Sequence, residues 1–468
     1  MSVRMNLSSA ARAMAGNPEG GDVAFQGVST DSRKVSGGEL FIALRGERFD
    51  GHDFVAAALE RGAAAAAVDA AGATALRDAG VAGRLPLIVV ADTRAALGDL
   101  AAHWRARFAL PVIGVTGSNG KTTSKEMITS ILRAAFGADA VLATAGNLNN
   151  DIGLPLTLLG LGDEHRAAVI ELGMNHPGEI AGLANIGRPT VALLTNVQRA
   201  HLEGMGTLEA IAAEKGGIFS GLDQDGVAVF NADDPWAGLW RAQSAHCRRR
   251  CFSLGGAAEV AGQCWTHGLE NHVAIEADGE RIEVDLALPG THNARNALGA
   301  AAAALAAGAP LAAARQGLTD FRGIAGRLQR RAGLRGALVL DDTYNANPDS
   351  VRAGIDVLAA TIGRQILVLG DMGEVGEMTG QFHDEVGGYA KSQGIDCLLT
   401  LGESSALAAA NFGAGGRHFR KIGDLVAALL AELTPAAIVL VKGSRFMRME
   451  RVVDAITLPR EQEKPPCC

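Results

Sequence analysis

A glycine-rich turn directly after an apolar run constrains this chain more than any other feature. Residues 111–116 read Pro-Val-Ile-Gly-Val-Thr, and the turn that follows covers residues 117–123. The apolar run predicts a buried strand, and the apolar positions that recur up to residue 135 predict a helix from Thr122 to about Ala135. A strand, a tight glycine turn and a helix in this order indicate an α/β fold.

The same turn has the chemistry of a phosphate-binding loop. Its glycines let the backbone wrap closely around an anion, and the free amides at the start of the helix supply donors and positive potential. Lys121 adds a charge for the outer phosphates, and the Thr122 hydroxyl is a hard oxygen suited to magnesium. Val115 stands where the full motif has a glycine, so a chance loop is the alternative, but the flanking strand and helix favour a nucleotide site. We therefore predict that a nucleoside triphosphate is bound by Gly117, Ser118, Asn119, Gly120, Lys121, Thr122 and Thr123.

Composition narrows the choice of partners. The 468 residues carry a net charge of −8 and only 4% aromatic residues, so we expect no nucleic acid partner and no attraction to an acidic membrane. The longest uncharged stretch, residues 297–314, is mostly alanine and glycine and is too weakly apolar for a membrane span. The N-terminus lacks an apolar core of signal-peptide type, and six cysteines form no disulfide framework in a chain of this length. We expect a cytoplasmic, monomeric protein.

One group of cysteines and histidines could be interpreted as a zinc site. It consists of His246, Cys247, Cys251, Cys264 and His267. No pair of ligands recurs at a zinc spacing, so ordinary reduced thiols are the favoured interpretation.

The order of predicted elements indicates an α/β protein of three domains. Residues 1–90 form a small N-terminal α/β domain. Residues 91–326 alternate strands with helices, which indicates a parallel sheet covered by helices, and short alternating runs between residues 245 and 288 indicate antiparallel hairpins. Residues 327–458 repeat a strand roughly every thirty to forty residues, the βαβ spacing of a Rossmann-like domain. The tail, residues 459–468, reads as disordered.

Capping residues predict two helix starts in the central domain. Asp92 opens the helix that leads to the phosphate-binding loop, and Thr207 can cap the helix that carries Lys215.

Polar side chains after the predicted central strands are further candidates. Glu171 ends the apolar run 167–170, where a carboxylate can hold magnesium directly or through water; a helix-capping or salt-bridged acid is the alternative. Asn196, His201 and Lys215 follow the next strand. Spacing alone does not single these three out, because a lone histidine is more often a surface or core residue and a lone helix lysine is usually solvated.

Two polar segments follow further along the chain. Residues 290–296 read as a helix start with His292 and Asn296 on one face, which suits a purine edge or a ribose, although a helix cap explains them equally well. Residues 340–348 are an apolar strand that ends in two acids, followed by a polar turn closed by proline. Open α/β sheets bind ligands at such strand ends, and turn chemistry alone does not explain two adjacent acids.

Together these segments resemble the Mur ligases, the ATP-dependent amide-forming enzymes of peptidoglycan precursor synthesis. The match runs from about residue 28 to residue 456. The strings that carry it are Thr30-Asp31-Ser32-Arg33, Gly46-Glu47-Arg48-Phe49-Asp50-Gly51-His52-Asp53-Phe54, Ala145-Gly146-Asn147-Leu148-Asn149-Asn150-Asp151-Ile152-Gly153, Ala200-His201-Leu202-Glu203-Gly204, Asp342-Thr343-Tyr344-Asn345-Ala346-Asn347-Pro348 and Lys442-Gly443-Ser444-Arg445. They are similar to the family member that joins D-alanyl-D-alanine to UDP-N-acetylmuramoyl-tripeptide. The Asp-Asn-Pro-Arg string of the sister enzyme that adds the diamino acid is not found.

The resemblance implies roles for matching residues. ATP would be held by residues 117–123 and, at adenine, phosphate and ribose, by Asn296, Arg327 and Asp342. The implied catalytic residues are Lys121, His201 and Lys215, and the implied ligands of two magnesium ions are Thr122, Glu171, His201 and Lys215. The implied substrate contacts for uridine diphosphate are Ser29, Thr30, Asp31 and Arg33, and those for the muramoyl peptide are Asn147, Asn149 and Asp151. Asn347 is a further implied substrate contact, and the incoming dipeptide would be bound by Lys442, Ser444 and Arg445. Arg45 stands where the family has a lysine, so the charge is kept but the geometry is not.

The resemblance also implies that Lys215 is carbamylated by carbon dioxide. This change turns a cation into an anion that can stabilise a metal beside clustered phosphates. It needs the neutral amine, so the pKa of Lys215 must be depressed by a nearby metal or by partial burial.

The implied reaction is carboxylate activation in cell wall biogenesis, a process on which cell shape and cell division depend. The tripeptide carboxylate attacks the γ-phosphorus of ATP, and the amine of D-alanyl-D-alanine then attacks the acyl phosphate. We expect the third domain to swing and close the site. One alternative is a folylpolyglutamate-type synthetase, which would lack the N-terminal uridine diphosphate module. The other is a non-catalytic ATP-binding switch protein, which would not need Glu171, His201 and Lys215 in metal-ligand positions.

Overall fold

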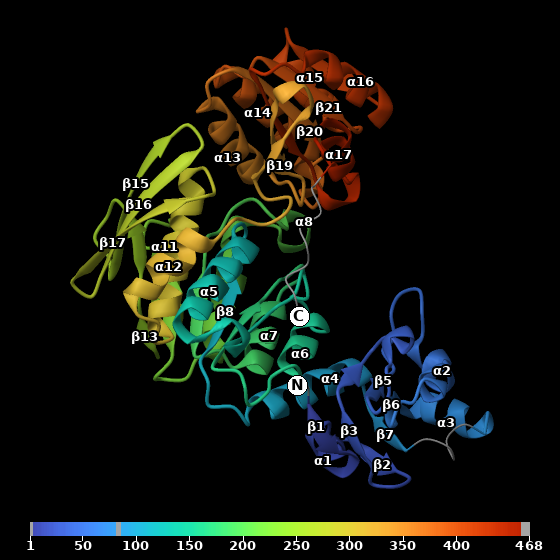
Figure 1. Ribbon diagram of the computed structural model, residues 1–468. Coiled ribbons are helices and arrows are strands. Elements are labelled where there is room, and N and C mark those ends of the chain that lie inside the picture. Colours follow the sequence, from blue (N-terminus) through green and yellow to red (C-terminus); the bar gives the residue numbers. More distant parts are fainter. Residues whose placement is uncertain (1–2, 81–85, 460–468) are drawn as a thin grey trace.

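Three α/β domains follow one another along the chain in the computed structural model, which describes residues 3–80 and 86–459. The N-terminal domain is blue in Figure 1, and the C-terminal domain is orange and red on the opposite side of the central domain. The three-domain α/β prediction is therefore confirmed. The boundaries at residues 90, 326 and 458 stay predictions, and the predicted disordered tail lies, apart from Pro459, outside the described residues.

The N-terminal domain and the helix that leaves it contain β1 (Arg4–Asn6), α1 (Leu7–Ala13), β2 (Asn17–Glu19), β3 (Ala24–Gln26), β4 (Val28–Ser29), β5 (Leu40–Ile42), α2 (Val55–Glu60), β6 (Ala65–Asp69), α3 (Ala70–Asp78), β7 (Leu87–Val90) and α4 (Thr93–Arg105). Five strands form a sheet in the order β2-β7-β6-β5-β4, and β1 pairs with β3 beside it. Apolar side chains of β1, α1 and α4 join one core that continues into the central domain. The N-terminal domain therefore packs directly against its neighbour.

The central domain contains β8 (Val112–Thr116), α5 (Lys121–Phe136), β9 (Val141–Ala143), α6 (Gly153–Leu158), β10 (Ala167–Glu171), α7 (Glu179–Gly187), β11 (Val191–Leu194), α8 (Leu202–Met205), α9 (Leu208–Gly216), β12 (Val227–Phe230), α10 (Ala237–Gln243) and β13 (Arg248–Arg249). Its six strands are parallel, in the order β13-β12-β11-β8-β10-β9. Along β8, Val112 faces the core with α4 and α7, whereas Ile113 and Val115 face the core with α5. Helices thus cover both faces, which explains why these strands are apolar throughout.

A small sheet follows in the same domain, made of β14 (Phe252–Leu254), β15 (Val260–His267), β16 (Glu270–Ala277) and β17 (Glu280–Leu286) and followed by α11 (Thr291–Ala306) and α12 (Leu311–Asp320). The predicted antiparallel hairpins are confirmed by β15, β16 and β17, whereas β14 runs parallel to β15. α11 lies against both the small sheet and strands β11 and β12 of the parallel sheet. Its buried alanines allow this close approach, so the alanine-rich stretch is a core helix. No helix in the two described ranges is long and apolar enough to cross a membrane.

The C-terminal domain contains β18 (Gln329–Ala332), β19 (Leu338–Asp342), α13 (Pro348–Ala359), β20 (Arg364–Gly370), α14 (Thr379–Ser392), β21 (Cys397–Leu401), α15 (Ala406–Phe412), β22 (Gly416–Phe419), α16 (Ile422–Glu432), β23 (Ala437–Lys442) and α17 (Glu450–Ile456). The strand order is β18-β19-β23-β20-β21-β22, and only β18 is antiparallel to its neighbour. Helices α13, α14 and α15 cover one face and α16 and α17 the other. Because β19, β20 and β23 are parallel and adjacent, the loops that follow them meet at one edge of the sheet.

Candidate active site between the central and C-terminal domains

A cavity of about 330 Å³ lies where the central and C-terminal domains meet. The phosphate-binding loop and the start of α11 form one wall, and the loop after β19 and the start of α13 form the other. The candidate residues from the sequence that line it are Asn119, Gly120, Thr123, Asn196, His292, Asn296, Arg327, Asp342, Asn347 and Lys442. Three segments that are far apart in the sequence are therefore brought together, as the predicted nucleotide site requires.

Two glycines shape the phosphate-binding loop. Gly117 has a φ of +149° and Gly120 a φ of +82°, values that side chains rarely adopt. A β-carbon at Gly120 would lie only 2.3 Å from Oδ1 of Asn296. α5 begins at the next residue, so its first amide groups are free to receive an anion.

Lys121 is subject to the charges of two carboxylates from different domains. Its Nζ donates to the backbone carbonyl of Gly117 at 2.7 Å. Burial lowers the pKa of Lys121, and the charges of Glu171 and Glu374 act in the opposite direction. Glu171 comes from the central sheet and Glu374 from the loop after β20, so Lys121 marks the point where the two domains face each other.

Glu171 has the environment of a metal ligand. It ends β10 and is 2% exposed. Its Oε1 accepts a hydrogen bond from Nδ2 of Asn149 at 2.8 Å, but no described residue hydrogen-bonds to its buried Oε2. An unpartnered carboxylate oxygen beside a phosphate-binding loop fits magnesium, which prefers oxygen ligands. The hydroxyl of Thr122, another of the four predicted metal ligands, accepts a hydrogen bond from Nη2 of Arg327 at 2.9 Å.

Lys215 is a buried amine near the end of α9, in the helix that Thr207 caps as predicted. Its side chain is among the largest that are fully buried. Burial holds the pKa of Lys215 well below its ordinary value, and the positive charge of Lys121 lowers it further. The depressed pKa that carbamylation requires is therefore present, and burial, with Lys121, accounts for it.

His201 connects the central domain to the C-terminal domain. It precedes α8 with a φ of +58°, and its Nδ1 lies 3.0 Å from Oε2 of Glu374. Burial lowers the pKa of His201, Glu374 raises it, and the charges of Lys121 and Lys215 lower it. The three predicted catalytic residues therefore share one electrostatic environment.

The zinc interpretation has no support in the described part of the chain. Cys247, Cys251 and Cys264 are free thiols. Within residues 3–80 and 86–459, no three His, Cys, Asp or Glu side chains lie together as a metal-binding group.

The residues predicted for adenosine and for the dipeptide are held in place by contacts with one another and with neighbouring side chains. Asn296 donates from Nδ2 to Oδ1 of Asn293 at 3.1 Å, and the guanidinium of Arg327 lies 4.3 Å from the ring centre of Tyr344. Asp342 accepts a hydrogen bond from the buried Nζ of Lys442 at 2.6 Å. Asp342 and Lys442 were predicted for different substrates, and the structure joins them in a single ion pair.

Two further residues predicted for the dipeptide differ in their surroundings. Ser444 is buried and donates to the carbonyl of Ala346 at 3.1 Å while it accepts from the amide of Gly373 at 2.7 Å. It thus joins the loops after β19, β20 and β23. Arg445 is exposed and pairs with Glu450 at 3.0 Å.

The residues predicted for the uridine and muramoyl groups lie outside the cavity between the central and C-terminal domains. In the N-terminal domain, Asp31 accepts hydrogen bonds from the exposed guanidinium of Arg33, which lowers the pKa of Asp31 to about 2. Asp151 pairs with Arg94 on α4, whereas Asn149 reaches Glu171. Of these predicted contacts, Asn149 is joined by a hydrogen bond to the predicted metal ligands.

The structure adds residues that sequence reasoning missed. Glu374 lies in the loop after β20, so the strand-end rule could have selected it. Arg199 lies between the predicted Asn196 and His201, but no pattern in the sequence marks it. It contacts the C-terminal domain through two carboxylates.

Comparisons with known proteins agree with this architecture. Three family patterns match the chain: the Mur ligase family catalytic domain over residues 24–105, the Mur ligase middle domain over residues 115–304 and the Mur ligase glutamate ligase domain over residues 326–445. The UDP-N-acetylmuramoyl-tripeptide–D-alanyl-D-alanine ligase of Escherichia coli is 40% identical over 97% of this chain and 98% of its own length. The ligase of the same name from Bacillus subtilis is 35% identical, with the same coverage.

Solved structures show the same similarity in three dimensions. MurF from Acinetobacter baumannii matches with a TM-score of 0.88 and 33% identity over 97% of this chain and 98% of that one. MurF ligase from Thermotoga maritima, in complex with ADP, matches with a TM-score of 0.78 and 28% identity over 92% and 96%. The sequence match to these relatives covers nearly the whole chain and all three domains. The chain therefore belongs to the Mur ligase family.

Proposed function

We propose that the chain is an ATP-dependent ligase that joins D-alanyl-D-alanine to UDP-N-acetylmuramoyl-tripeptide, with release of ADP and phosphate, in peptidoglycan precursor synthesis. The observation that carries the proposal is the meeting of the phosphate-binding loop, Glu171, His201 and Lys215 with the C-terminal domain at one edge of the central sheet. The names of the relatives support the two substrates, and the ADP complex of the Thermotoga maritima enzyme supports the nucleotide. The cytoplasm stays the expected location.

Two magnesium ions belong to this proposal. Thr122 and Glu171 would hold one ion, and the orphaned Oε2 of Glu171 supports this assignment. His201 and Lys215 would hold the other. Bound magnesium would offset negative charge where a carboxylate and a triphosphate approach each other.

Carbamylation of Lys215 is the second part of the proposal. Burial lowers the pKa of Lys215, and this shift favours the neutral amine, which is the form that reacts with carbon dioxide. The product is an anion, so it would supply a second acidic group near Glu171 and His201. The unmodified Lys215 has no acidic group, so its carbamylation would complete the magnesium site at His201 and Lys215.

Substrate binding follows the domain order. The nucleotide phosphates would lie on residues 117–123, with Asn296, Arg327 and Asp342 around the nucleoside. Uridine diphosphate would bind at Ser29, Thr30, Asp31 and Arg33, and the muramoyl peptide at Asn147, Asn149 and Asp151. The hydrogen bond between Asn149 and Glu171 supports delivery of the peptide carboxylate to the edge of the sheet where the γ-phosphate would lie. Asn347, Lys442, Ser444 and Arg445 would contribute to the dipeptide side.

The reaction then proceeds in two steps. The terminal carboxylate of the tripeptide attacks the γ-phosphorus of ATP, which breaks the bond to ADP and forms an acyl phosphate. The amine of D-alanyl-D-alanine attacks the acyl carbon, phosphate leaves, and the new amide loses a proton. Lys121 would stabilise the negative charge that gathers on the transferred phosphoryl group.

A folylpolyglutamate synthetase is the alternative within the ligases. A mutant of L. casei FPGS matches with a TM-score of 0.56 and 18% identity over 75% of this chain, which shows a shared fold only. A non-catalytic ATP-binding switch is the other alternative. The buried Lys215 amine and the buried Glu171 Oε2, which has no hydrogen-bond partner among the described residues, favour catalysis over it, because burying such polar groups destabilises a fold that makes no use of them.

One experiment separates these functions. Phosphate release from ATP is measured with UDP-N-acetylmuramoyl-tripeptide and D-alanyl-D-alanine, together and separately. We expect release only when both are present, and transfer of ¹⁸O from the tripeptide carboxylate into the released phosphate. Release with folate and glutamate would favour the synthetase, and the absence of release with any acceptor would favour the switch.

A further inference from the structure

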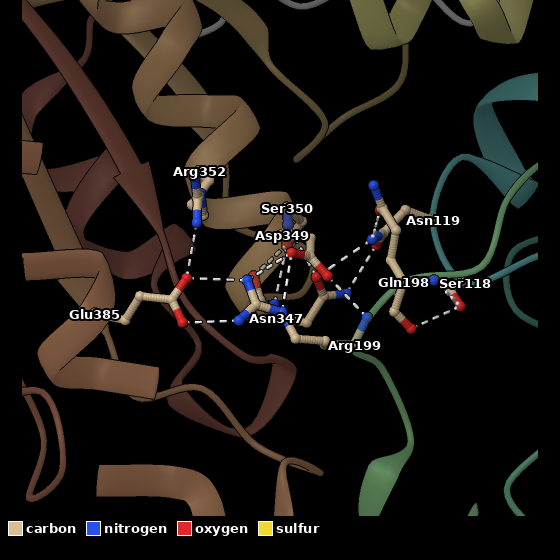
Figure 2. A network of polar contacts seen from close by, with 9 residues as sticks. All are labelled: Ser118, Asn119, Gln198, Arg199, Asn347, Asp349, Ser350, Arg352 and Glu385. Atoms are coloured by element: carbon tan, nitrogen blue, oxygen red, sulfur yellow. Dashed lines mark hydrogen bonds and ion pairs between the residues drawn. The ribbon is translucent and has the colours of Figure 1, made fainter. Parts of the chain in front are cut away.

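A short segment after β11 lies between the phosphate-binding loop and the C-terminal domain (Figure 2). On one side, the amide of Gln198 donates to Oγ of Ser118 at 3.0 Å, and this Oγ donates to the carbonyl of Gln198 at 3.1 Å. The side chain of Gln198 accepts a hydrogen bond from Nδ2 of Asn119. The segment is therefore attached to two residues of the phosphate-binding loop.

On its other side, the next residue reaches two helices of the C-terminal domain. Arg199 donates to Asp349 on α13 from its backbone amide at 2.8 Å, from Nε at 3.0 Å and from Nη2 at 2.6 Å. It also donates to Glu385 on α14, from Nη1 at 2.7 Å and from Nη2 at 3.1 Å. Figure 2 shows the guanidinium of Arg199 between these two carboxylates. One side chain thus holds the first turn of α13 and the middle of α14 together.

The surroundings make this contact stronger than an ordinary surface ion pair. The side chains of Arg199, Asp349 and Glu385 are only 21%, 23% and 29% exposed, and Arg199 lies 5.1 Å from the ring centre of Phe382. Hydrogen bonding to Arg199, and then to Arg352, lowers the pKa of Glu385, so the carboxylate is kept ionised. A guanidinium that forms paired hydrogen bonds to carboxylates has a fixed geometry that lysine does not reproduce.

A second contact lies beside the first. Asn347 donates from Nδ2 to Oδ1 of Asn119 at 2.8 Å, and Asn119 donates from Nδ2 to Oδ1 of Asn347 at 3.2 Å. Asn347 also caps α13, the helix that carries Asp349. Both contacts therefore join the start of α13 to the phosphate-binding loop and its neighbouring segment.

We propose that Arg199 is a positioning residue for ligation, which docks α13 and α14 against the phosphate-binding loop and so holds the polar loop after β19 over the nucleotide. This inference rests on the proposed function. According to this proposal, the side chain of Arg199, in the segment between Asn196 and His201, stabilises the closed arrangement of the central and C-terminal domains. Arg199 itself lines no part of the cavity and touches none of the predicted reacting groups.

The test compares Arg199→Ala with a matched arginine. Arg281 also bonds two carboxylates, those of Glu276 and Glu283, but all three lie within the hairpin of β16 and β17. We expect Arg199→Ala to enlarge the radius of gyration measured by X-ray scattering with an ATP analogue, magnesium and the UDP-substrate, and Arg281→Ala to leave it unchanged. Scattering does not depend on turnover, so it tests the docking even if the proposed reaction is wrong.

Kinetics supply the second measurement. We expect kcat for ligation to fall about tenfold to a hundredfold in Arg199→Ala, because truncating one partner of a partly buried charge pair weakens docking by such a factor. The dissociation constant of ADP changes less, since residues 117–123 are intact. Arg199→Lys should restore only part of kcat, because an ammonium group cannot bond both carboxylates in the same geometry.

A variant on the partner side covers the case in which Arg199→Ala does not fold. Glu385→Gln keeps the shape of the side chain and removes its charge, so we expect a smaller loss of kcat and a smaller expansion. In the double variant, Glu385→Gln should add little to the loss of kcat that Arg199→Ala causes alone, because both substitutions remove the same interaction. The proposal is overturned if Arg199→Ala matches Arg281→Ala in scattering and kcat, or if the effects of Arg199→Ala and Glu385→Gln add in full. If Arg199→Ala does not fold, the proposal is overturned when Glu385→Gln matches Arg281→Ala in both measurements.

Discussion

Asn347 combines a helix cap with a contact between domains, and two substitutions can separate these roles. Its Oδ1 accepts a hydrogen bond from the amide of Ser350 at 2.9 Å, while the Ser350 hydroxyl accepts from the amide of Asn347 at 3.0 Å. This reciprocal capping box starts α13 directly before Pro348. The same side chain forms two hydrogen bonds with Asn119 of the phosphate-binding loop.

Alanine at this position removes both roles. Loss of a cap lowers helix stability by about 1 kcal/mol, within a range of roughly 0.5 to 2. That free energy corresponds to about a fivefold loss of hydrogen-exchange protection in α13, at about 1.4 kcal/mol for each factor of ten. Serine caps nearly as well as asparagine but is too short to reach Asn119, so Asn347→Ser should keep protection within about twofold of the wild type.

The effect of the contact between Asn347 and Asn119 is expected in kcat. Two neutral hydrogen bonds contribute about 0.5 to 1.5 kcal/mol each, so both Asn347→Ala and Asn347→Ser should lower kcat by at least about fivefold. Exchange is measured by mass spectrometry on peptides that cover residues 348–359, and ligation by phosphate release. If serine lost protection as alanine does, the cap would not reside in the side chain. If serine kept full activity, the bonds to Asn119 would have no part in docking.

Three further outcomes are expected. Gly120→Ala should weaken ADP binding at least about tenfold without unfolding the protein, because a β-carbon there would overlap Asn296 and force a strained φ. Calorimetric titration measures the affinity for ADP, and an unchanged affinity would contradict the loop geometry. Glu171→Gln should abolish the magnesium dependence of ADP binding but leave binding without magnesium intact; equal losses under both conditions would argue against metal ligation. Gly387→Ala should lower the free energy of unfolding of the C-terminal domain by about 1 to 3 kcal/mol in denaturant, because its β-carbon would lie 2.1 Å from a backbone oxygen of α15. Gly182→Ala, which has open space around it, should leave the free energy of unfolding unchanged. Equal stability of the two variants would refute the packing argument.

Local patterns in the chain were enough to place most elements near the site. The strand β8, the glycine turn and the helix α5 follow from apolar spacing and from glycine positions, since each depends on neighbours within a few residues. Asp92 caps α4 and Thr207 caps α9 as predicted, because a cap involves only the next three residues. The depressed pKa of Lys215 was also expected, although only as a consequence of the family resemblance.

Contacts between domains could not be predicted from such local patterns. Arg199 and Asp349 are separated by 150 residues, and Glu374 reaches His201 from another sheet. No local rule pairs these side chains, because their proximity depends on which sheet edges face each other after folding. The ion pair between Asp342 and Lys442 has the same origin: β19 and β23 become neighbours only when the parallel sheet forms.

The sequence by itself determined the phosphate-binding loop, the three α/β domains and the family, since these rest on residue order and local spacing. Only the tertiary structure decided which carboxylates act on the charge of Lys121, that Lys215 is buried, and that Arg199 and its neighbour Gln198 join the phosphate-binding loop to α13 and α14. The physical reason is that burial and electrostatic fields are properties of the packed domains. They arise when distant segments exclude water together, and no short stretch of chain contains them.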